Sequence, residues 1–259
     1  MIQYIASDLD GTLLQNNASK LNPVIFEQIR KLKEKGILFI AASGRQYHSI
    51  RYLFEPVKDD IAYVAENGSL CIYHGEVISR GLIERELGLR IIDAGREYKN
   101  CHPLVSCEST AYTDSKDGKF AQQMNELFHN KVAYIPDLYK VQEPFLKLAM
   151  CDFSGTDMVM KYFKDRFASE INIVTSGNIW VDFIAPNANK GTALEGLLRH
   201  LGLSAKNGIA FGDQYNDVEM LEIAGTSYAM ANAAPGIAYY ADYVTRSVEE
   251  VVEDVLGAV

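Results

Sequence analysis

The sequence of 259 residues has few of the features that are typical of secreted proteins, membrane-spanning proteins or small proteins stabilised by a structural metal. It contains only four cysteines, and no two of them have C-x-x-C spacing, so reduced thiols are favoured over a metal site near Cys101, His102 and Cys107. No run of about 18 apolar residues occurs, which excludes a transmembrane helix. The N-terminus also lacks a basic segment followed by an apolar stretch, so we expect no signal peptide and a cytoplasmic location.

Basic charge is scarce as well, because 25 Lys and Arg stand against 34 Asp and Glu, for a net charge of −9. Such a chain has no basic field to neutralise a phosphate backbone, so we expect no nucleic-acid partner. A small anionic substrate remains compatible with this charge, since a few converging positive groups can hold one phosphate. Hydrophobic residues make up 48% of the chain, and the length is sufficient for two domains with their own cores.

Both ends of the sequence alternate between short apolar strands and amphipathic helices. The segment from Ile2 to Ser7 predicts a buried strand, and a helix follows that begins at Asn22-Pro23 and ends near Gly36. The same alternation predicts further elements at Ile37–Ala42, Lys190–Leu201, Gly208–Gly212, Ser227–Met230 and Asp242–Thr245. Repeated strand–helix units of this kind indicate a doubly wound parallel sheet with helices on both faces.

The middle of the sequence has a different pattern, in which strand candidates cluster. Strands are predicted at Leu104–Thr113, Phe145–Phe153, Ile171–Thr175 and Trp180–Ala185, and helices at Lys119–Phe128 and Thr156–Ala168. Asp182 alternates with apolar neighbours, which predicts a solvent-facing strand residue. We therefore expect an α/β core formed by residues 1–81 and 187–259, with an inserted α+β cap domain at residues 82–186.

Polar loops follow three of the predicted strands of the core. They comprise residues 8–12 (DLDGT), 43–45 (SGR) and 212–217 (GDQYND), and the helix that begins near residues 189–191 (NKG) adds Lys190. Ligands of open parallel sheets bind beyond the carboxyl ends of the strands, where these loops would converge. Clustered carboxylates need a cation to ionise together, and Mg²⁺ prefers hard oxygen ligands, of which Asp8 and Asp213 are the natural side chains.

The remaining polar groups of these loops suit a bound phosphoryl group. Lys190 would act as a point charge, and Ser43, the Gly44 amide and Asn216 could donate hydrogen bonds to phosphate oxygens. Arg45 either contacts the substrate or pairs with a carboxylate, and the sequence leaves both open.

These four motifs resemble those of the haloacid dehalogenase superfamily of phosphatases. D-x-D-G-T-L, S-G-R, N-K-G and G-D-x-x-N-D occur in that order, with a large insertion between the second and third, as in the Cof-type group with a large α/β cap. Residues 66–68 (ENG) and 229–233 (AMANA) resemble the same group. The likeness covers about residues 1–80 and 187–259, and it departs from the commonest pattern at Gln214, where glycine is frequent.

The resemblance implies a role for each carboxylate of the motifs. Asp8 would be the nucleophile and a Mg²⁺ ligand, and Asp213 would be the second side-chain ligand. Asp10 would be the general acid and then the base, with its backbone carbonyl on the metal. Asp217 would support the metal site or orient Lys190.

The resemblance also implies the phosphate-binding set and the reaction. Ser43, Lys190 and Asn216 would bind the phosphoryl group of a small phosphorylated metabolite, with sugar phosphates as the substrate class. The chain would hydrolyse phosphate monoesters through a phosphoaspartate. A sugar phosphomutase and a phosphoacceptor or binding module without turnover remain alternatives, and the oligomeric state stays open.

Overall fold

The structure is a computed structural model that describes residues 2–16, 18–98, 101–122, 124, 131–176 and 179–258. The chain divides into two compact units: unit 1 comprises Met1–Ser79 and Asn189–Val259, and unit 2 comprises Arg80–Ala188. Within the described parts of the chain, no helix has both the length and the apolar character needed to cross a membrane.

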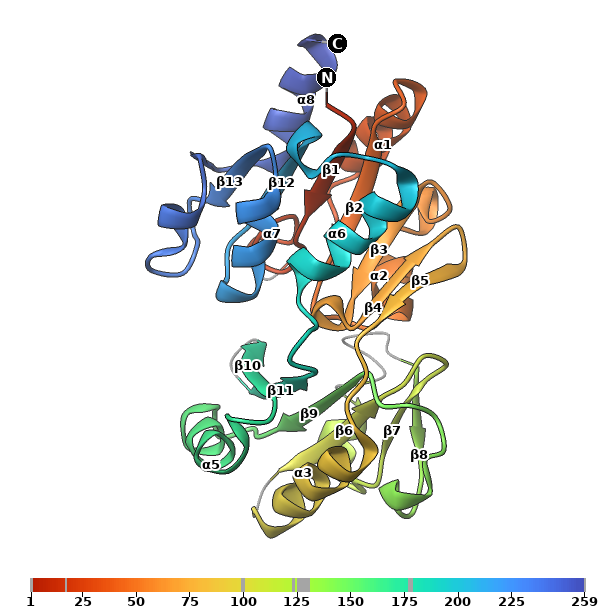
Figure 1. The fold of residues 1–259 in the computed structure, drawn as a ribbon, viewed down its shortest axis with the longest axis vertical. Helices are drawn as coiled ribbons and strands as arrows, with labels where there is room; N and C mark the ends of the chain where they lie inside the picture. Colours follow the sequence, from red (N-terminus) through yellow and green to blue (C-terminus); the bar gives the residue numbers. More distant parts are fainter. Residues whose placement is uncertain are drawn as a thin grey trace. The chain divides into compact units, whose positions relative to one another are not determined.

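Unit 1 contains an eight-stranded sheet with the strand order β14-β13-β12-β1-β2-β3-β4-β5 (Figure 1). The six strands from β14 to β3 pair in parallel, with Ala6 between Ala210 and Ile40, and β4 runs antiparallel to β3. The strands are β1 (Tyr4–Ser7), β2 (Leu38–Ala42), β3 (Ile61–Ala65), β4 (Leu70–Tyr73), β5 (Glu76–Arg80), β12 (Gly208–Gly212), β13 (Thr226–Met230) and β14 (Tyr243–Thr245).

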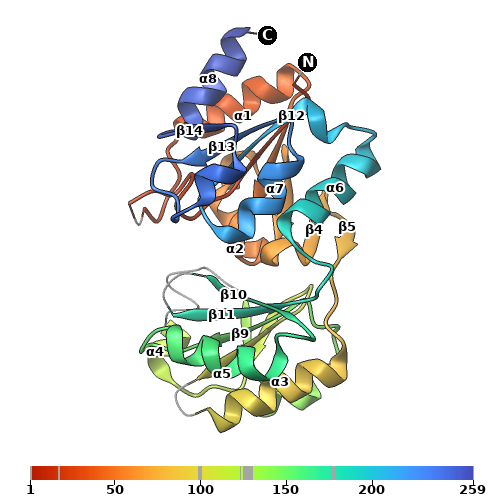
Figure 2. The same cartoon turned by 60° about the vertical axis from the view of Figure 1, so that its left-hand side comes forward.

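Helices cover both faces of this sheet (Figure 2). On one face, α6 (Lys190–Leu201) and α7 (Val218–Ile223) pack through their apolar residues against alternate residues of the central strands. On the other face lie α1 (Val24–Glu34), α2 (Tyr47–Leu53) and α8 (Val248–Ala258), with α1 against β2 and α8 and with α2 against β3. The predicted doubly wound α/β core is confirmed.

Local sequence signals account for the positions of these elements. In α1, Ile25, Ile29 and Leu32 form a buried stripe, and Gly36 follows the helix with a φ of 73°. All four residues of β1 are buried, as expected for a strand that has helices on both sides. Gly202 ends α6 in the left-handed conformation that glycine adopts without steric cost.

Unit 2 contains a six-stranded sheet with the order β10-β11-β9-β6-β7-β8. Its pairs are antiparallel apart from β7 and β8, which run parallel. The predicted strand Leu104–Thr113 is wrong as a single element, because a turn closed by the Cys107 N–H and the Thr110 carbonyl divides it. The strands are β6 (His102–Ser106), β7 (Ala111–Thr113), β8 (Val132–Tyr134), β9 (Lys147–Cys151), β10 (Asn172–Ser176) and β11 (Trp180–Ile184).

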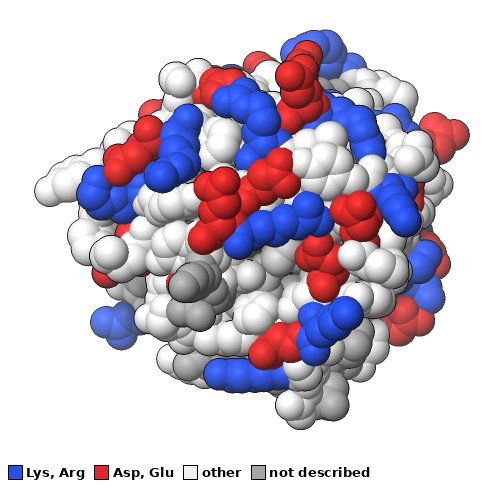
Figure 3. Space-filling model, turned by 90° about the horizontal axis from the view of Figure 1, so that it is seen from below, with Lys and Arg blue, Asp and Glu red and all other residues white. Residues whose placement is uncertain are grey.

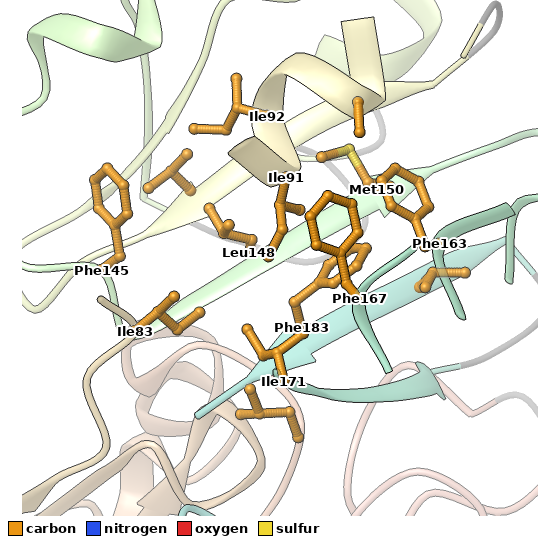
Figure 4. Close-up of a cluster of buried hydrophobic side chains, with 14 of the residues drawn as sticks. Ile83, Ile91, Ile92, Phe145, Leu148, Met150, Phe163, Phe167, Ile171 and Phe183 are labelled. Carbon is orange, nitrogen blue, oxygen red and sulfur yellow. The ribbon is translucent and has the colours of Figure 1, made fainter. Parts of the chain in front are cut away.

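Three α-helices of unit 2 are described: α3 (Arg85–Glu97), α4 (Gly118–Gln122) and α5 (Asp157–Phe167). The sequence analysis did not predict α3, and the predicted helix Lys119–Phe128 includes residues 123 and 125–128, which lie outside the described residues. One face of the sheet packs against α3 and α5 in an apolar core (Figure 4). In this core, Ile91 of α3 and Phe163 of α5 lie over Met150 and Phe183 of the sheet.

The prediction that Asp182 faces solvent is wrong. Asp182 is 1% exposed, and its carboxylate lies 3.2 Å from the ammonium group of Lys147. Alternation along β11 predicts only that Asp182 lies on the face opposite Phe183, not whether that face meets water.

Candidate active site

The site lies at the carboxyl ends of adjacent parallel strands of unit 1. From β1 the chain proceeds to β2 and β3 on one side, and later returns to β12 on the other side of β1. This reversal of strand order is the point at which open α/β sheets bind ligands. The loops after β1, β2 and β12 are the three that the sequence analysis singled out.

Lys190 links two of the predicted site carboxylates. It occupies the first turn of α6 and is fully buried, and its Nζ donates to Asp8 Oδ1 and to Asp217 Oδ1, both at 2.6 Å. Asp8 is 5% exposed and follows β1 directly. A fully buried ammonium group requires such partners, because its transfer out of water is costly. The Lys190 side chain therefore links the end of β1 to the segment that follows β12.

Asp217 organises the loop after β12. Its Oδ2 accepts hydrogen bonds from the backbone N–H groups of Asp213 and Gln214, each at 2.9 Å. Asp213 in turn accepts a hydrogen bond from the Thr12 hydroxyl at 2.9 Å through Oδ1. The Asp217 oxygens accept from the buried Lys190 ammonium and from two backbone N–H groups, so this residue supports the site. Asp213 Oδ2 accepts only from the Gln214 side chain, at 3.3 Å, and Asp8 Oδ2 accepts from no described residue, so Asp8 and Asp213 are the better candidates to bind a ligand.

Gly11 allows the loop after β1 to approach Asp213 closely. Its φ is 95°, which side-chain-bearing residues rarely adopt, and a Cβ atom at this position would overlap with the Asp213 carboxylate. Glycine is therefore required at this position of D-x-D-G-T for two reasons, the positive φ and the close approach of Asp213. Asn232, after β13, fixes the same loop by donating to the Gly11 carbonyl at 2.8 Å.

Burial shifts the acid–base behaviour of this cluster. It raises the pKa of Asp8 well above its usual value, an effect that Lys190 opposes and that Asp217 and Asp213 reinforce. The pKa of Asp213 is also raised, first by burial and then by Asp217. Burial would lower the pKa of Lys190, but the Asp217 and Asp8 carboxylates outweigh it and keep the pKa above its usual value, so the ammonium stays charged.

Asp10 and Arg45 form a second pair. Arg45 Nε donates to Asp10 Oδ2 at 2.7 Å and Arg45 Nη2 donates to Asp10 Oδ1 at 2.6 Å, a bidentate arrangement. The Asp10 side chain is 54% exposed, unlike that of Asp8. Of the two roles left open for Arg45, the structure shows carboxylate pairing.

The other predicted phosphate ligands gather around Asn67, in the short turn after β3. Asn216 Nδ2 donates to Asn67 Oδ1 at 2.9 Å, and a Cβ atom on Gly44 would lie 2.9 Å from the same oxygen. The Asn67 N–H donates to the Ser43 carbonyl, and Ser43 is 1% exposed. The loops after β2, β3 and β12 therefore meet at Asn67, which the sequence analysis noted only as part of a family-like motif.

The residues present fit a divalent cation. Asp8, Asp213 and Asp217 each place a carboxylate oxygen within 4.8 Å of those of the other two. Lys190 donates to Asp8 and Asp217 but not to Asp213, so the negative charge of the three carboxylates exceeds the single positive charge if all three ionise. Asp8 Oδ2 is buried and accepts no hydrogen bond from any described residue. A hard oxygen donor set with uncompensated negative charge is typical of a Mg²⁺ site.

Thr12 and Asn67 are the contributors that residue-by-residue reasoning missed. Thr12 was visible in the sequence as part of the first motif, but its contact is with a carboxylate 201 residues away. Asn67 was visible as part of residues 66–68, and a positive φ of 56° at this position suits asparagine. In both cases the sequence indicated the motif but not the partner.

This geometry accords with comparisons to known proteins. A family model of haloacid dehalogenase-like hydrolases matches residues 5–256. The chain therefore belongs to the haloacid dehalogenase-like hydrolase family, and the predicted membership is confirmed.

Several curated relatives of this chain are named phosphatases. The Escherichia coli 5-amino-6-(5-phospho-D-ribitylamino)uracil phosphatase YbjI is 27% identical over 243 residues, which cover 93% of this chain and 90% of the relative. The Bacillus subtilis phosphatase YwpJ is 26% identical, with 96% of each chain covered. These names agree with the predicted reaction class.

Solved structures share the fold over the full length. A HAD/COF-like hydrolase from Plasmodium vivax has a TM-score of 0.90 at 23% identity, with 100% of this chain and 96% of that chain covered. A Streptococcus mutans protein has a TM-score of 0.86 at 26% identity, with 99% and 100% covered. These structures therefore share the arrangement of the elements with this chain.

Proposed function

We propose that this protein is a magnesium-dependent phosphatase that hydrolyses small phosphate monoesters through a phosphoaspartate on Asp8. The observation that supports this most directly is the buried Asp8 carboxylate, which has Lys190 on one oxygen and no hydrogen-bond donor from the described residues on the other. Such a carboxylate has an oriented anchor and a free oxygen with which to attack phosphorus. The ammonium group beside it would offset the charge of an approaching phosphate.

In the first step, an Asp8 oxygen forms a bond to phosphorus while the bond from phosphorus to the ester oxygen breaks. The electron pair of that bond goes to the leaving oxygen, which takes a proton from the Asp10 carboxylic acid. Both oxygens of Asp10 accept from Arg45 in the structure, so Asp10 has to exchange at least one of these bonds for the leaving group. The products are an alcohol and the phosphoaspartate.

In the second step, water attacks the same phosphorus atom and gives its proton to the Asp10 carboxylate. The bond between phosphorus and the Asp8 oxygen breaks, its electron pair restores the Asp8 carboxylate, and inorganic phosphate leaves. Lys190 stabilises the negative charge in both steps from its buried position. Ser43 and the Gly44 amide would donate hydrogen bonds to the transferred group, and Asn216 would do so after releasing Asn67.

Asp8 and Asp213, with the Asp10 backbone carbonyl, would hold Mg²⁺. When bound, the ion supplies positive charge that offsets the phosphate and keeps the neighbouring carboxylates ionised. We also propose that residues 1–81 and 187–259 act as the catalytic core, and that residues 82–186 act as a cap that recognises the alcohol part of the substrate.

Sugar phosphates and sugar-alcohol phosphates are the proposed substrate class. Two curated relatives, YbjI of Escherichia coli and YwtE of Bacillus subtilis, are named for a substrate with a phosphorylated ribityl chain. We extend only the class, a phosphorylated polyol of metabolite size in the cytoplasm, to this protein.

The test is phosphate release from a panel of sugar phosphates, nucleotides and p-nitrophenyl phosphate in the presence of MgCl₂, with the parent protein and Asp8→Asn. The parent should release phosphate, and Asp8→Asn should fold like the parent but lose turnover, because an amide is a poor nucleophile. Retention of more than about a tenth of parental activity would refute Asp8 as the nucleophile.

The same assay separates hydrolysis from the alternatives. A phosphomutase would convert one hexose phosphate to an isomer without releasing phosphate. A phosphoacceptor module would take up one phosphate per chain and stop. Either outcome would contradict the proposal.

A further inference from the structure

The carboxylate of Asp213 has a hydrogen-bond donor on each of its two oxygens. The Thr12 hydroxyl donates to Oδ1 at 2.9 Å, and the Gln214 side-chain amide donates to Oδ2 at 3.3 Å. Asp8, the other proposed side-chain ligand of the cation, differs in this respect, because its Oδ2 accepts from no described residue. Within the described residues, the two proposed ligands therefore offer the ion unequal carboxylates, and Asp213 is the one that is held at both oxygens.

The backbone of Asp213 is fixed as well. Its carbonyl accepts from the Ala234 N–H at 2.8 Å, and its N–H donates to Asp217 Oδ2 at 2.9 Å. Because the main chain is held on both sides, the carboxylate of this residue, which is 2% exposed, changes its orientation only by rotation of its own side chain. Thr12 and Gln214 oppose this rotation, so these two donors restrict the lone pairs that Asp213 presents to an ion.

Gln214 is the donor that can be changed with the least disturbance to the fold. Its backbone is extended, with a φ of −125°, which residues of any type adopt freely, and the residue is exposed. Glycine, which is frequent at this position among sequences with the same motifs, would leave Asp213 Oδ2 without this donor. The contact is therefore supplied by this chain and not by the shared motif itself.

The number of carboxylate oxygens that bind an ion matters for the choice of cation. Mg²⁺ requires a near-ideal octahedral arrangement and keeps several waters, so one oxygen from each carboxylate is sufficient. Ca²⁺ takes about 6–8 oxygen ligands, and carboxylates can contribute both of their oxygens to this larger set. Binding through one oxygen of Asp213 leaves the donor on the other oxygen in place, whereas binding through both oxygens competes with both donors.

We propose that Gln214 is a positioning residue that, together with Thr12, restricts Asp213 to binding a cation through one oxygen and so favours Mg²⁺ over Ca²⁺. This inference rests on the proposed function, because it concerns the cation that the phosphatase would use. Donors to a metal-binding side chain contribute about 10- to 100-fold to metal affinity. The Gln214 contact is long and the residue is exposed, so we expect a smaller effect from it.

The experiment titrates the metal-free, full-length protein with MgCl₂ and, separately, with CaCl₂ in an isothermal titration calorimeter. Gln214→Met keeps the approximate length of the side chain but removes the amide donor, and Thr12→Val removes the donor on the other oxygen. The matched control is Gln142→Met, because Gln142 is also an exposed glutamine, whose amide donates to the Lys140 carbonyl at 3.2 Å. Thermal unfolding in EDTA establishes that each variant folds.

Weak binding to surface carboxylates is measured with Asp213→Asn. Figure 3 shows one face of the molecule on which acidic side chains lie among basic ones, and such exposed carboxylates attract divalent cations without forming a site. Binding that persists unchanged in Asp213→Asn belongs to this background and not to the site.

In Gln214→Met, the Kd for Mg²⁺ should rise by about 3- to 10-fold while the Kd for Ca²⁺ stays the same or falls, so the preference for Mg²⁺ falls by at least about 3-fold. Thr12→Val should change the preference in the same direction, and Gln142→Met should keep both Kd values of the parent. A merely structural role of Gln214 would weaken the binding of both ions equally. An unchanged ratio of the two Kd values in Gln214→Met would therefore overturn the inference. Should Thr12→Val fail to fold, Gln214→Met alone decides.

Failure of the phosphatase function would be recognised separately. A parent that releases no phosphate, but binds Mg²⁺ and shows the expected change of the Kd ratio in Gln214→Met, would refute the phosphatase and support the role of Gln214. A parent that releases phosphate in excess EDTA, and whose titrations match those of Asp213→Asn, would refute the metal dependence and this inference together.

Discussion

Replacement of Lys190 by methionine should destabilise the protein far more than its single charge suggests. The Lys190 ammonium is fully buried and lies 2.6 Å from both Asp8 and Asp217. The variant therefore leaves these two buried carboxylates without their positively charged partner. Loss of one partner from a buried ion pair costs about 3–5 kcal/mol. A domain is stable by only about 5–15 kcal/mol, so this is a large fraction of the total.

The assay is thermal unfolding followed by circular dichroism at neutral pH in EDTA. For a chain of this size, each kcal/mol corresponds to about 2–4 °C in Tm, so Lys190→Met should melt roughly 6–20 °C below the parent. Adding Asp8→Asn to this variant should recover part of the loss, since it removes one of the uncompensated carboxylates. Turnover should be absent in both variants.

The control is Lys161→Met, which removes an exposed lysine whose partner in α5 is Asp165 at 2.7 Å. Such a surface pair four residues apart on a helix contributes about 0.3–0.5 kcal/mol, so its Tm should shift by no more than about 2 °C. If Lys190→Met melted as close to the parent as this control, the ion-pair cluster described for the site would not exist in solution.

Two further changes test the site from other directions. Gly11→Ala should lose most activity, because its Cβ would displace the Asp213 carboxylate. The control is Gly36→Ala, which is also at positive φ but has no atom within 4 Å of a Cβ; it should lower the free energy of unfolding by only about 1–2 kcal/mol and leave kcat/KM unchanged. Equal kcat/KM in the two variants would contradict the close approach of Gly11 to Asp213. MgCl₂ should restore the activity that EDTA removes in the parent, and at 100 times its Kd it should raise the free energy of unfolding by about 2.7 kcal/mol and so raise the Tm. Asp213→Asn should show neither effect. Full activity of the parent in excess EDTA would contradict the proposed metal dependence.

The core of the fold was accessible from the sequence because its signals are local. Helix α6 was predicted with its observed bounds, since Asn189 caps it and Gly202 ends it. Strand β12 was likewise predicted as observed, as a short apolar run before a polar loop. Helix α3 was not predicted. The predicted strand of residues 104–113 spans a turn because residues 107–110 contain no glycine or proline to mark it.

The sequence by itself determined which residue types the site contains, because each strand that ends in a polar loop places its functional groups at the same edge of a parallel sheet. It did not determine which groups touch. Only the tertiary structure shows which side chains pair. Arg45 pairs with Asp10, Asn67 with Asn216, and Lys147 with Asp182. Such pairings depend on strand register and on packing between segments that are far apart in sequence. The alternation along a strand predicts which face of the sheet a residue lies on, but it does not predict what packs against that face.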